Sequence, residues 1–164
     1  MSNKRMKHQL TQNVKLLQKA VLIHNSKILI LQRSQDSQSR PGSWDLPGGN
    51  SEWPEKNGED QNQENMHQED IAREIKEETG LTVFSQHFTK ENLTFFRTFY
   101  EATKDVYTII TAFRVEMPSD FERSQIVLSD EHIDHKWINI EDLNEYDFGG
   151  KRGEFIKDMI RSAI

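Results

Sequence analysis

The apolar residues of the chain gather in short runs that are separated by polar stretches. Runs rich in aliphatic, β-branched and aromatic residues predict β-strands, and they cover residues 14–23, 27–33, 81–88, 93–102, 106–117 and 135–140. The first two runs flank His24-Asn25-Ser26, a connection short enough for a β-hairpin. Residues 34–50 are rich in Ser, Gly and Pro, which predicts a loop.

A different spacing predicts two helices. Apolar or small side chains recur with helical spacing at Ile71, Ala72, Ile75 and Thr79, and again within residues 153–164. Gly80 occupies the position where a left-handed residue ends a helix. Strands before and after a central helix, followed by a terminal helix, predict an α/β fold with helices packed on a mixed sheet.

The length of 164 residues fits one domain. We place this domain at residues 13–164, after a polar N-terminal tail of residues 1–12. Residues 55–70 have Met66 as their single apolar side chain, so they cannot bury enough surface to offset the entropy cost of ordering. We therefore expect a mobile loop there, which gives way to helix near Met66 or His67.

Three glutamates crowd the central helix. At about 100° per residue, Glu74, Glu77 and Glu78 fall within one arc beside the apolar face. Carboxylate oxygens clustered in this way suit Mg²⁺ or Mn²⁺. The alternative is a solvated face on which Arg73 and Glu77 form an ion pair. The helix alone does not decide between the two interpretations.

Composition narrows the choice of function. The net charge of −6 argues against a nucleic-acid-binding protein, because such proteins usually carry a basic surplus. The chain has no cysteine, which excludes disulfides, zinc–thiolate sites and cysteine nucleophiles and fits a cytoplasmic location. Neither a signal-peptide pattern nor a membrane-length apolar run occurs, so we expect a cytoplasmic protein without a membrane partner.

The segment Leu46-Pro47-Gly48-Gly49, followed by Glu55, precedes the acidic helix. Together with Arg73-Glu74-Ile75-Lys76-Glu77-Glu78-Thr79-Gly80-Leu81, it resembles the signature of the Nudix hydrolase family, and of MutT-like members in particular. That signature reads G-x5-E-x7-R-E-U-x-E-E-x-G-U, where U is aliphatic, and its second half matches at every fixed position.

The spacing within the signature departs from the family pattern. Seventeen residues separate Glu55 from Arg73 where the family has seven, so residues 56–65 form an insertion. Glu59, which follows a glycine, is a rival for the first glutamate of the signature, and both candidates stay open. The insertion is interpreted as a loop that is either an inert bulge or a lid.

The resemblance implies the Nudix fold, a mixed β-sheet sandwiched between α-helices. It also implies metal-dependent hydrolysis of a nucleoside diphosphate linked to another group, with Mg²⁺ as cofactor and Mn²⁺ as a substitute. The leading substrate is a nucleoside triphosphate, including an oxidised one; nucleotide sugars and dinucleoside polyphosphates come next. A Nudix-like module that binds a nucleotide without hydrolysing it is the alternative, and the chain is expected to be a monomer or a homodimer.

The resemblance also suggests roles for the residues of the signature. Glu77 and Glu78 are the principal metal ligands, together with the carbonyl of Gly48. Glu74 is a further ligand or a base near the attacking water. Arg73 orients the glutamates by ion pairing.

Outside the signature, Glu131 is our candidate for a remote metal ligand or base, because it lies in a later segment that resembles the corresponding family loop. Arg33, at the end of a strand, is a candidate phosphate contact. Trp44 either stacks on a base or anchors the glycine turn by packing. The nearby His132 and His135 are expected to be solvated.

Overall fold

The computed structural model describes residues 12–52 and 64–164. Its strands are β1 (Asn13–His24), β2 (Lys27–Arg33), β3 (Trp44–Asp45), β4 (Gly48–Asn50), β5 (Leu93–Glu101), β6 (Val106–Glu116) and β7 (His132–Ile138). Its α-helices are α1 (Met66–Thr79) and α2 (Gly150–Ser162), and short 3₁₀ turns lie at Ser85–His87, Arg123–Gln125 and Ile140–Glu145. Of the expected tail, only Gln12 is among the described residues. Glu55, Glu59 and residues 56–63 of the insertion also lie outside the described residues.

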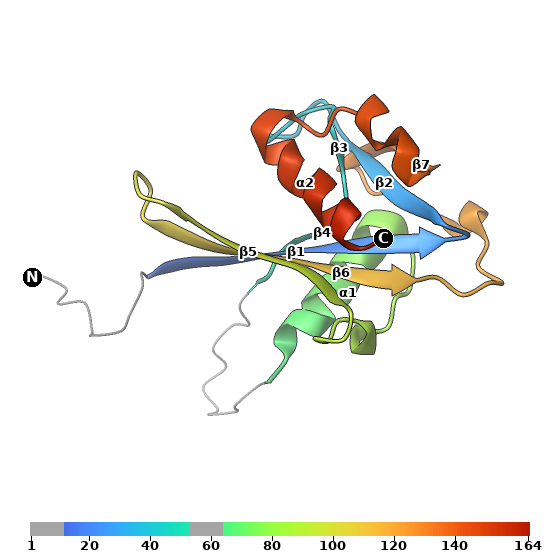
Figure 1. Cartoon of the computed structure of the whole chain (residues 1–164), viewed down its shortest axis with the longest axis horizontal. Helices are drawn as coiled ribbons and strands as arrows, with labels where there is room; N and C mark the ends of the chain where they lie inside the picture. The colour runs from blue at the N-terminus through green and yellow to red at the C-terminus, as the bar shows by residue number, and fades with distance from the viewer. Residues whose placement is uncertain (1–11, 53–63) are drawn as a thin grey trace, which may run out of the picture.

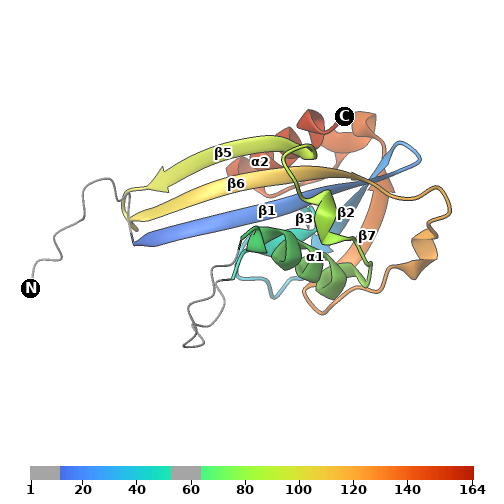
Figure 2. The same ribbon diagram turned by 90° about the horizontal axis from the view of Figure 1, so that it is seen from below.

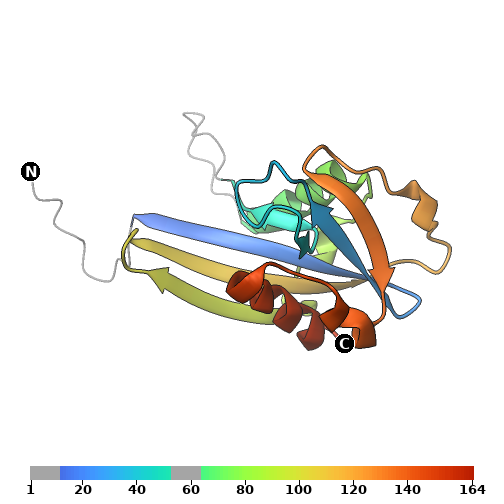
Figure 3. The same cartoon turned by 90° about the horizontal axis from the view of Figure 1, so that it is seen from above.

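The strands form one mixed sheet with the order β3-β2-β1-β6-β5, to which β4 adds through β1 and β7 through β2. Only the β1–β6 pair is parallel among the strand pairs of the described chain. The predicted hairpin is confirmed, since Ile23 pairs with Ile28. The helices α1 and α2 lie on opposite faces of the sheet (Figures 1, 2 and 3), which confirms the expected sandwich.

Two hydrophobic clusters fill the layers on either side of the sheet. Val21 of β1 belongs to the cluster with Met159 of α2, whereas its neighbour Leu22 belongs to the cluster with Ile75 of α1. Because consecutive side chains of a strand point to opposite faces, β1 needs apolar residues at every position where both faces are covered. The uninterrupted apolar run of residues 20–23 follows from this burial.

The prediction of a strand at residues 81–88 is wrong. This segment is extended and then forms the 3₁₀ turn Ser85–His87. Its apolar side chains Leu81, Val83 and Phe88 are buried in the α1 cluster, so burial alone produces the alternation that resembles a strand.

Two further element boundaries need correction. The predicted loop of residues 34–50 contains the short strands β3 and β4, and β7 begins three residues before its expected start at residue 135. Within residues 12–52 and 64–164, no helix is long and apolar enough to cross a membrane.

Candidate active site

Helix α1 brings the acidic residues beside the sheet. It ends at Gly80, which has a φ of 73° and whose N–H donates to the carbonyl of Lys76, as the sequence predicts. Ile71, Ile75 and Thr79 are buried, and Glu78 is buried with them on the same side of the helix. The carboxylate of Glu78 is thus held against the core, whereas Glu77 is exposed.

Glu78 meets the glycine turn directly. The backbone N–H of Gly48 donates a hydrogen bond to Oε2 of Glu78 at 2.8 Å. Burial raises the pKa of Glu78 to about 8, although Lys19 and the Gly48 hydrogen bond act to lower it. Glu78 is only 6% exposed, so its charged form is unfavourable without further positive charge nearby. A bound cation would supply the missing positive charge.

Glu74 lies over the second glycine of the turn. A Cβ atom built on Gly49 would lie 3.3 Å from Oε2 of Glu74, so the missing side chain leaves room for the carboxylate. Partial burial raises the pKa of Glu74; Arg73 opposes this shift, and Glu131 is among the acids that reinforce it. Glu131 therefore lies within electrostatic reach of the helix, although it comes from the segment just before β7.

Arg73 contacts several acids, and two of them, Glu74 and Glu77, belong to the signature. Its guanidinium lies 3.1 Å from Oε1 of Glu74 and 3.1 Å from Oε1 of Glu77. The Arg73–Glu77 pair of the solvated-face interpretation is therefore present. The same guanidinium also engages Glu74, the acid that lies over the turn.

A buried ionic network lies behind the turn, and its role was missed from the sequence. Asp45 of β3 is 1% exposed and contacts Lys19 at 3.2 Å, Arg33 at 3.1 Å and Arg40 at 2.8 Å. Burial alone would raise the pKa of Asp45, but Lys19, Arg40, the Leu46 N–H and Arg33 together hold it below its usual range. A lysine within an apolar strand was the signal that could have revealed the network.

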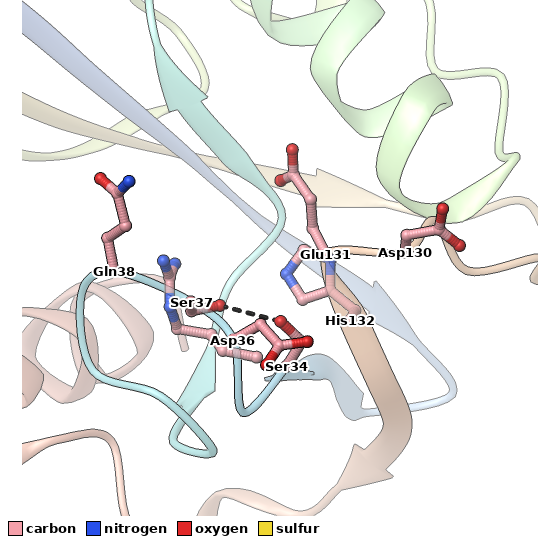
Figure 4. A pocket seen from close by; sticks show the side chains of 8 residues that line it. Ser34, Asp36, Ser37, Gln38, Asp130, Glu131 and His132 are labelled. Atoms are coloured by element: carbon pink, nitrogen blue, oxygen red, sulfur yellow. Dashed lines mark hydrogen bonds between the residues drawn. The ribbon is translucent and has the colours of Figure 1, made fainter.

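Arg33 also lines a pocket, shown in Figure 4, between the loop after β2 and the start of β7. Its Nε donates to the carbonyl of Ser39 at 2.8 Å, so the guanidinium is held by protein groups. Glu131 and His132 form the opposite wall of this pocket. The expectation of a solvated His132 is wrong: the ring is buried, and burial lowers its pKa to about 4.

Trp44 is buried and packed against other side chains. Its side chain is 8% exposed, and its ring packs edge-on against Tyr146 with the centroids 5.4 Å apart. The ammonium of Lys136 lies 5.4 Å from the Trp44 ring centroid. The burial and ring contacts fit the packed-anchor interpretation, and a role of Trp44 in substrate binding stays a prediction.

The donors near the turn fit a hard divalent cation in their chemistry. They are carboxylate and carbonyl oxygens, which Mg²⁺ and Mn²⁺ prefer. Across the described residues, no three acidic or histidine side chains are already arranged as a metal site. Glu77 is one reason why these side chains are not arranged as a metal site, since its side chain is 58% exposed and forms an ion pair with Arg73. An exposed side chain can change rotamer at small cost, so the residues fit the cation after local rearrangement.

The family model for the NUDIX domain matches residues 17–159. The chain belongs to the Nudix family. Within this family it is a Nudix pyrophosphohydrolase, and Nudix hydrolases depend on a divalent metal. The family resemblance and the expected Nudix fold are thus confirmed. No curated protein matches the sequence significantly.

Solved structures show the same fold at low identity. The MutT protein of Methanosarcina mazei is 24% identical, with a TM-score of 0.62 over 93% of this chain and 97% of that one. The bifunctional NMN adenylyltransferase/ADP ribose pyrophosphatase of Francisella tularensis, complexed with AMP and a Mn ion, is 22% identical, with a TM-score of 0.59 over 94% and 43%. The NUDIX domain of Shewanella oneidensis NrtR, complexed with ADP ribose, is 15% identical, with a TM-score of 0.57 over 97% and 92%.

Proposed function

We propose that this Nudix protein hydrolyses a phosphoanhydride bond of a nucleoside triphosphate, including an oxidised one, with Mg²⁺ as cofactor and Mn²⁺ as a substitute. The observation that carries the proposal is the position of Glu78, whose buried carboxylate meets the Gly48 amide beside Glu74. Burial raises the pKa of this group to about 8, and a bound cation would favour its ionised form. A triphosphate brings further negative charge to a site that is already acidic. A bound divalent cation would reduce the repulsion between the phosphates and the carboxylates.

Glu78, Glu77 and the carbonyl of Gly48 would hold the cation, with Glu74 or Glu131 as a further ligand. Bound Mg²⁺ would polarise the phosphoryl group and lower the pKa of the attacking water. The carboxylates of Glu78 and Glu77 come from adjacent positions of one helix, so α1 presents both from a rigid element.

The remaining side chains would move the proton and orient the reactants. Water attacks one phosphorus of the anhydride, its proton passes to a carboxylate, and the P–O bond to the leaving phosphate breaks. Glu74, whose partial burial raises its pKa, is one candidate for this base, and Glu131 is the other. Arg73 would hold Glu74 and Glu77 in place, while Arg33 would meet a phosphate at the edge of the pocket.

A substrate panel tests the proposal. Ordinary and oxidised nucleoside triphosphates, ADP-ribose, nucleotide sugars and dinucleoside polyphosphates are incubated with Mg²⁺, with Mn²⁺ or with EDTA, and phosphate and pyrophosphate release is measured. ADP-ribose is the second candidate substrate. One of the similar structures is an ADP ribose pyrophosphatase, and another is a NUDIX domain complexed with ADP ribose. We expect metal-dependent turnover of a triphosphate that the Glu78→Gln variant loses. Binding of a nucleotide without turnover would instead favour a sensor module.

A further inference from the structure

Lys19 is a buried cation in the middle of β1, and its ammonium reaches the glycine turn. The side chain is 5% exposed. Its Nζ donates to the carbonyl of Leu46 at 3.1 Å and to the carbonyl of Gly48 at 3.0 Å, and it lies 3.2 Å from Oδ1 of Asp45. An ammonium has three N–H donors. Lys19 therefore has a partner for each of its donors, and two of these partners are backbone carbonyls of the turn.

Gly48 connects Lys19 to the acidic helix. The carbonyl of Gly48 accepts from Lys19, while its N–H donates to Glu78 at 2.8 Å. Its φ of 119° lies in a region that side chains rarely adopt, and a Cβ atom there would collide with the carbonyl oxygen of Gln18. The backbone of this residue is therefore held by β1 on one side and by Glu78 on the other.

A purely structural role would make Lys19 a counter-ion for Asp45. Asp45 also has Arg33 at 3.1 Å and Arg40 at 2.8 Å, so it keeps two cationic partners when Lys19 is removed, although Lys19 lowers its pKa more than either arginine does. The two carbonyl contacts, by contrast, join the Lys19 ammonium directly to the turn that contains Gly48. The carbonyl of Gly48 is moreover the oxygen that the proposed function assigns to the cation.

We propose that Lys19 is a positioning residue of the active site: it orients the Gly48 carbonyl and, through the Gly48 amide, the Glu78 carboxylate to receive the divalent cation. This inference rests on the proposed metal-dependent hydrolysis. It adds a strand residue outside the Nudix signature to the groups that shape the metal site. Groups that orient metal ligands typically change metal affinity by about 10-fold to 100-fold when they are removed.

The Lys19→Met variant tests the proposal, with Lys15→Met as the matched control. Lys15 lies on the same strand, four positions earlier, and is exposed. Mn²⁺ binding is measured on the full chain without substrate, and the Gly48 amide resonance is recorded by NMR in the metal-free state. We expect Lys19→Met to shift that resonance, to bind Mn²⁺ about 10-fold to 100-fold more weakly and to lower kcat more than it raises KM. Lys15→Met should match the wild type in all of these measurements.

The absence of cysteine from the chain permits a chemical rescue. In Lys19→Cys the single thiol is alkylated in urea with 2-bromoethylamine, which restores an ammonium at nearly the lysine length, or with a neutral reagent of similar size. Both products are refolded and checked by circular dichroism. We expect the ammonium product to recover Mn²⁺ binding and the neutral product to remain weak.

Several outcomes would overturn the role of Lys19. Equal or tighter Mn²⁺ binding by Lys19→Met would show that the ammonium repels the cation or does not influence it. Refolding of the ammonium product alone would mean that Lys19 acts through stability of the fold. Failure of the proposed function is distinguishable, because the wild type itself would then show neither Mn²⁺ binding nor turnover.

Discussion

The guanidinium of Arg73 lies 3.1 Å from the carboxylate of Glu74 and 3.1 Å from that of Glu77. One guanidinium thus restrains Glu74, which lies over the glycine turn, and Glu77, the proposed metal ligand three positions later. Removing it should change the positions of the acids far more than the stability of the fold, because exposed ion pairs contribute about 1 kcal/mol or less.

The Arg73→Gln variant should therefore lose activity while keeping its unfolding midpoint. We expect kcat to fall by about 10-fold to 100-fold, as for other groups that orient metal ligands. Arg161→Gln is the matched control, since Arg161 forms a comparable exposed pair with Asp158 on α2. If Arg73→Gln lost no more activity than the control, Arg73 would have no role in orienting the acids.

Glu78→Gln should abolish turnover and stabilise the metal-free protein. The native pKa of about 8 lies above the unfolded value, so the folded state binds more protons between pH 4.5 and 8. Stability of the wild type should then fall as the pH rises through this window, at about 1.4 kcal/mol per pH unit at most. The variant has no such titration, so its advantage in urea unfolding should grow from pH 5 to pH 8.

Glu77→Gln provides the comparison for that experiment. Its side chain is 58% exposed, so we expect little change in the metal-free stability. Turnover should still fall, because the charge of a proposed metal ligand is lost. Added Mg²⁺ should stabilise the wild type more than either variant. Identical pH profiles for wild type and Glu78→Gln would contradict the assigned environment of Glu78.

Glu131→Gln separates a base or remote ligand from a surface acid. Glu131 raises the pKa of Glu74, so its neutralisation should shift the acid limb of the rate profile to lower pH if Glu74 is the base. A lower kcat with little change in KM is expected if Glu131 itself acts in the transition state. Asp130→Asn, on the adjacent pocket residue, is the control. An unchanged rate would show that Glu131 is a surface acid without a role in the reaction.

The two glycines of the turn should respond differently to alanine. Gly48→Ala should destabilise the fold by about 1–3 kcal/mol or more, because its φ is positive and the strand backbone blocks a Cβ. Gly49→Ala should retain stability but reduce activity, since the added methyl group would approach Oε2 of Glu74 to 3.3 Å. Thermal unfolding and kcat separate the two effects. Full activity in Gly49→Ala would show that Glu74 need not keep this position.

Local signals were sufficient for the elements that carry the acids. The helix from Met66 to Thr79 follows from its apolar spacing and from Gly80, whose left-handed φ of 73° ends it. Such features depend on neighbouring residues, so the sequence contains them directly. The strand prediction for residues 81–88 was wrong because it depended on tertiary packing. Leu81 and Val83 alternate as in a strand, but they are buried in the hydrophobic cluster that includes Ile75 of α1.

The parts of the site that were missed depend on contacts between distant residues. Asp45 and Lys19 are separated by 26 positions and meet only because β3 and β1 belong to one sheet. The packing of Trp44 likewise depends on Tyr146, which comes from a distant part of the chain. Composition and spacing indicate the reaction class, whereas the groups that support it are defined by tertiary structure.

The hydrogen bond between Gly48 and Glu78 joins residues that are 30 positions apart, and the contact between Lys19 and Gly48 joins residues that are 29 positions apart. Each contact therefore closes a long loop of the chain. Closing such loops costs entropy before the contacts compensate for it, whereas the hydrogen bonds of helix α1 join residues only four positions apart. During refolding from urea, helical ellipticity should therefore return ahead of Mn²⁺ binding. The proposed metal site would then be among the last parts of the molecule to form.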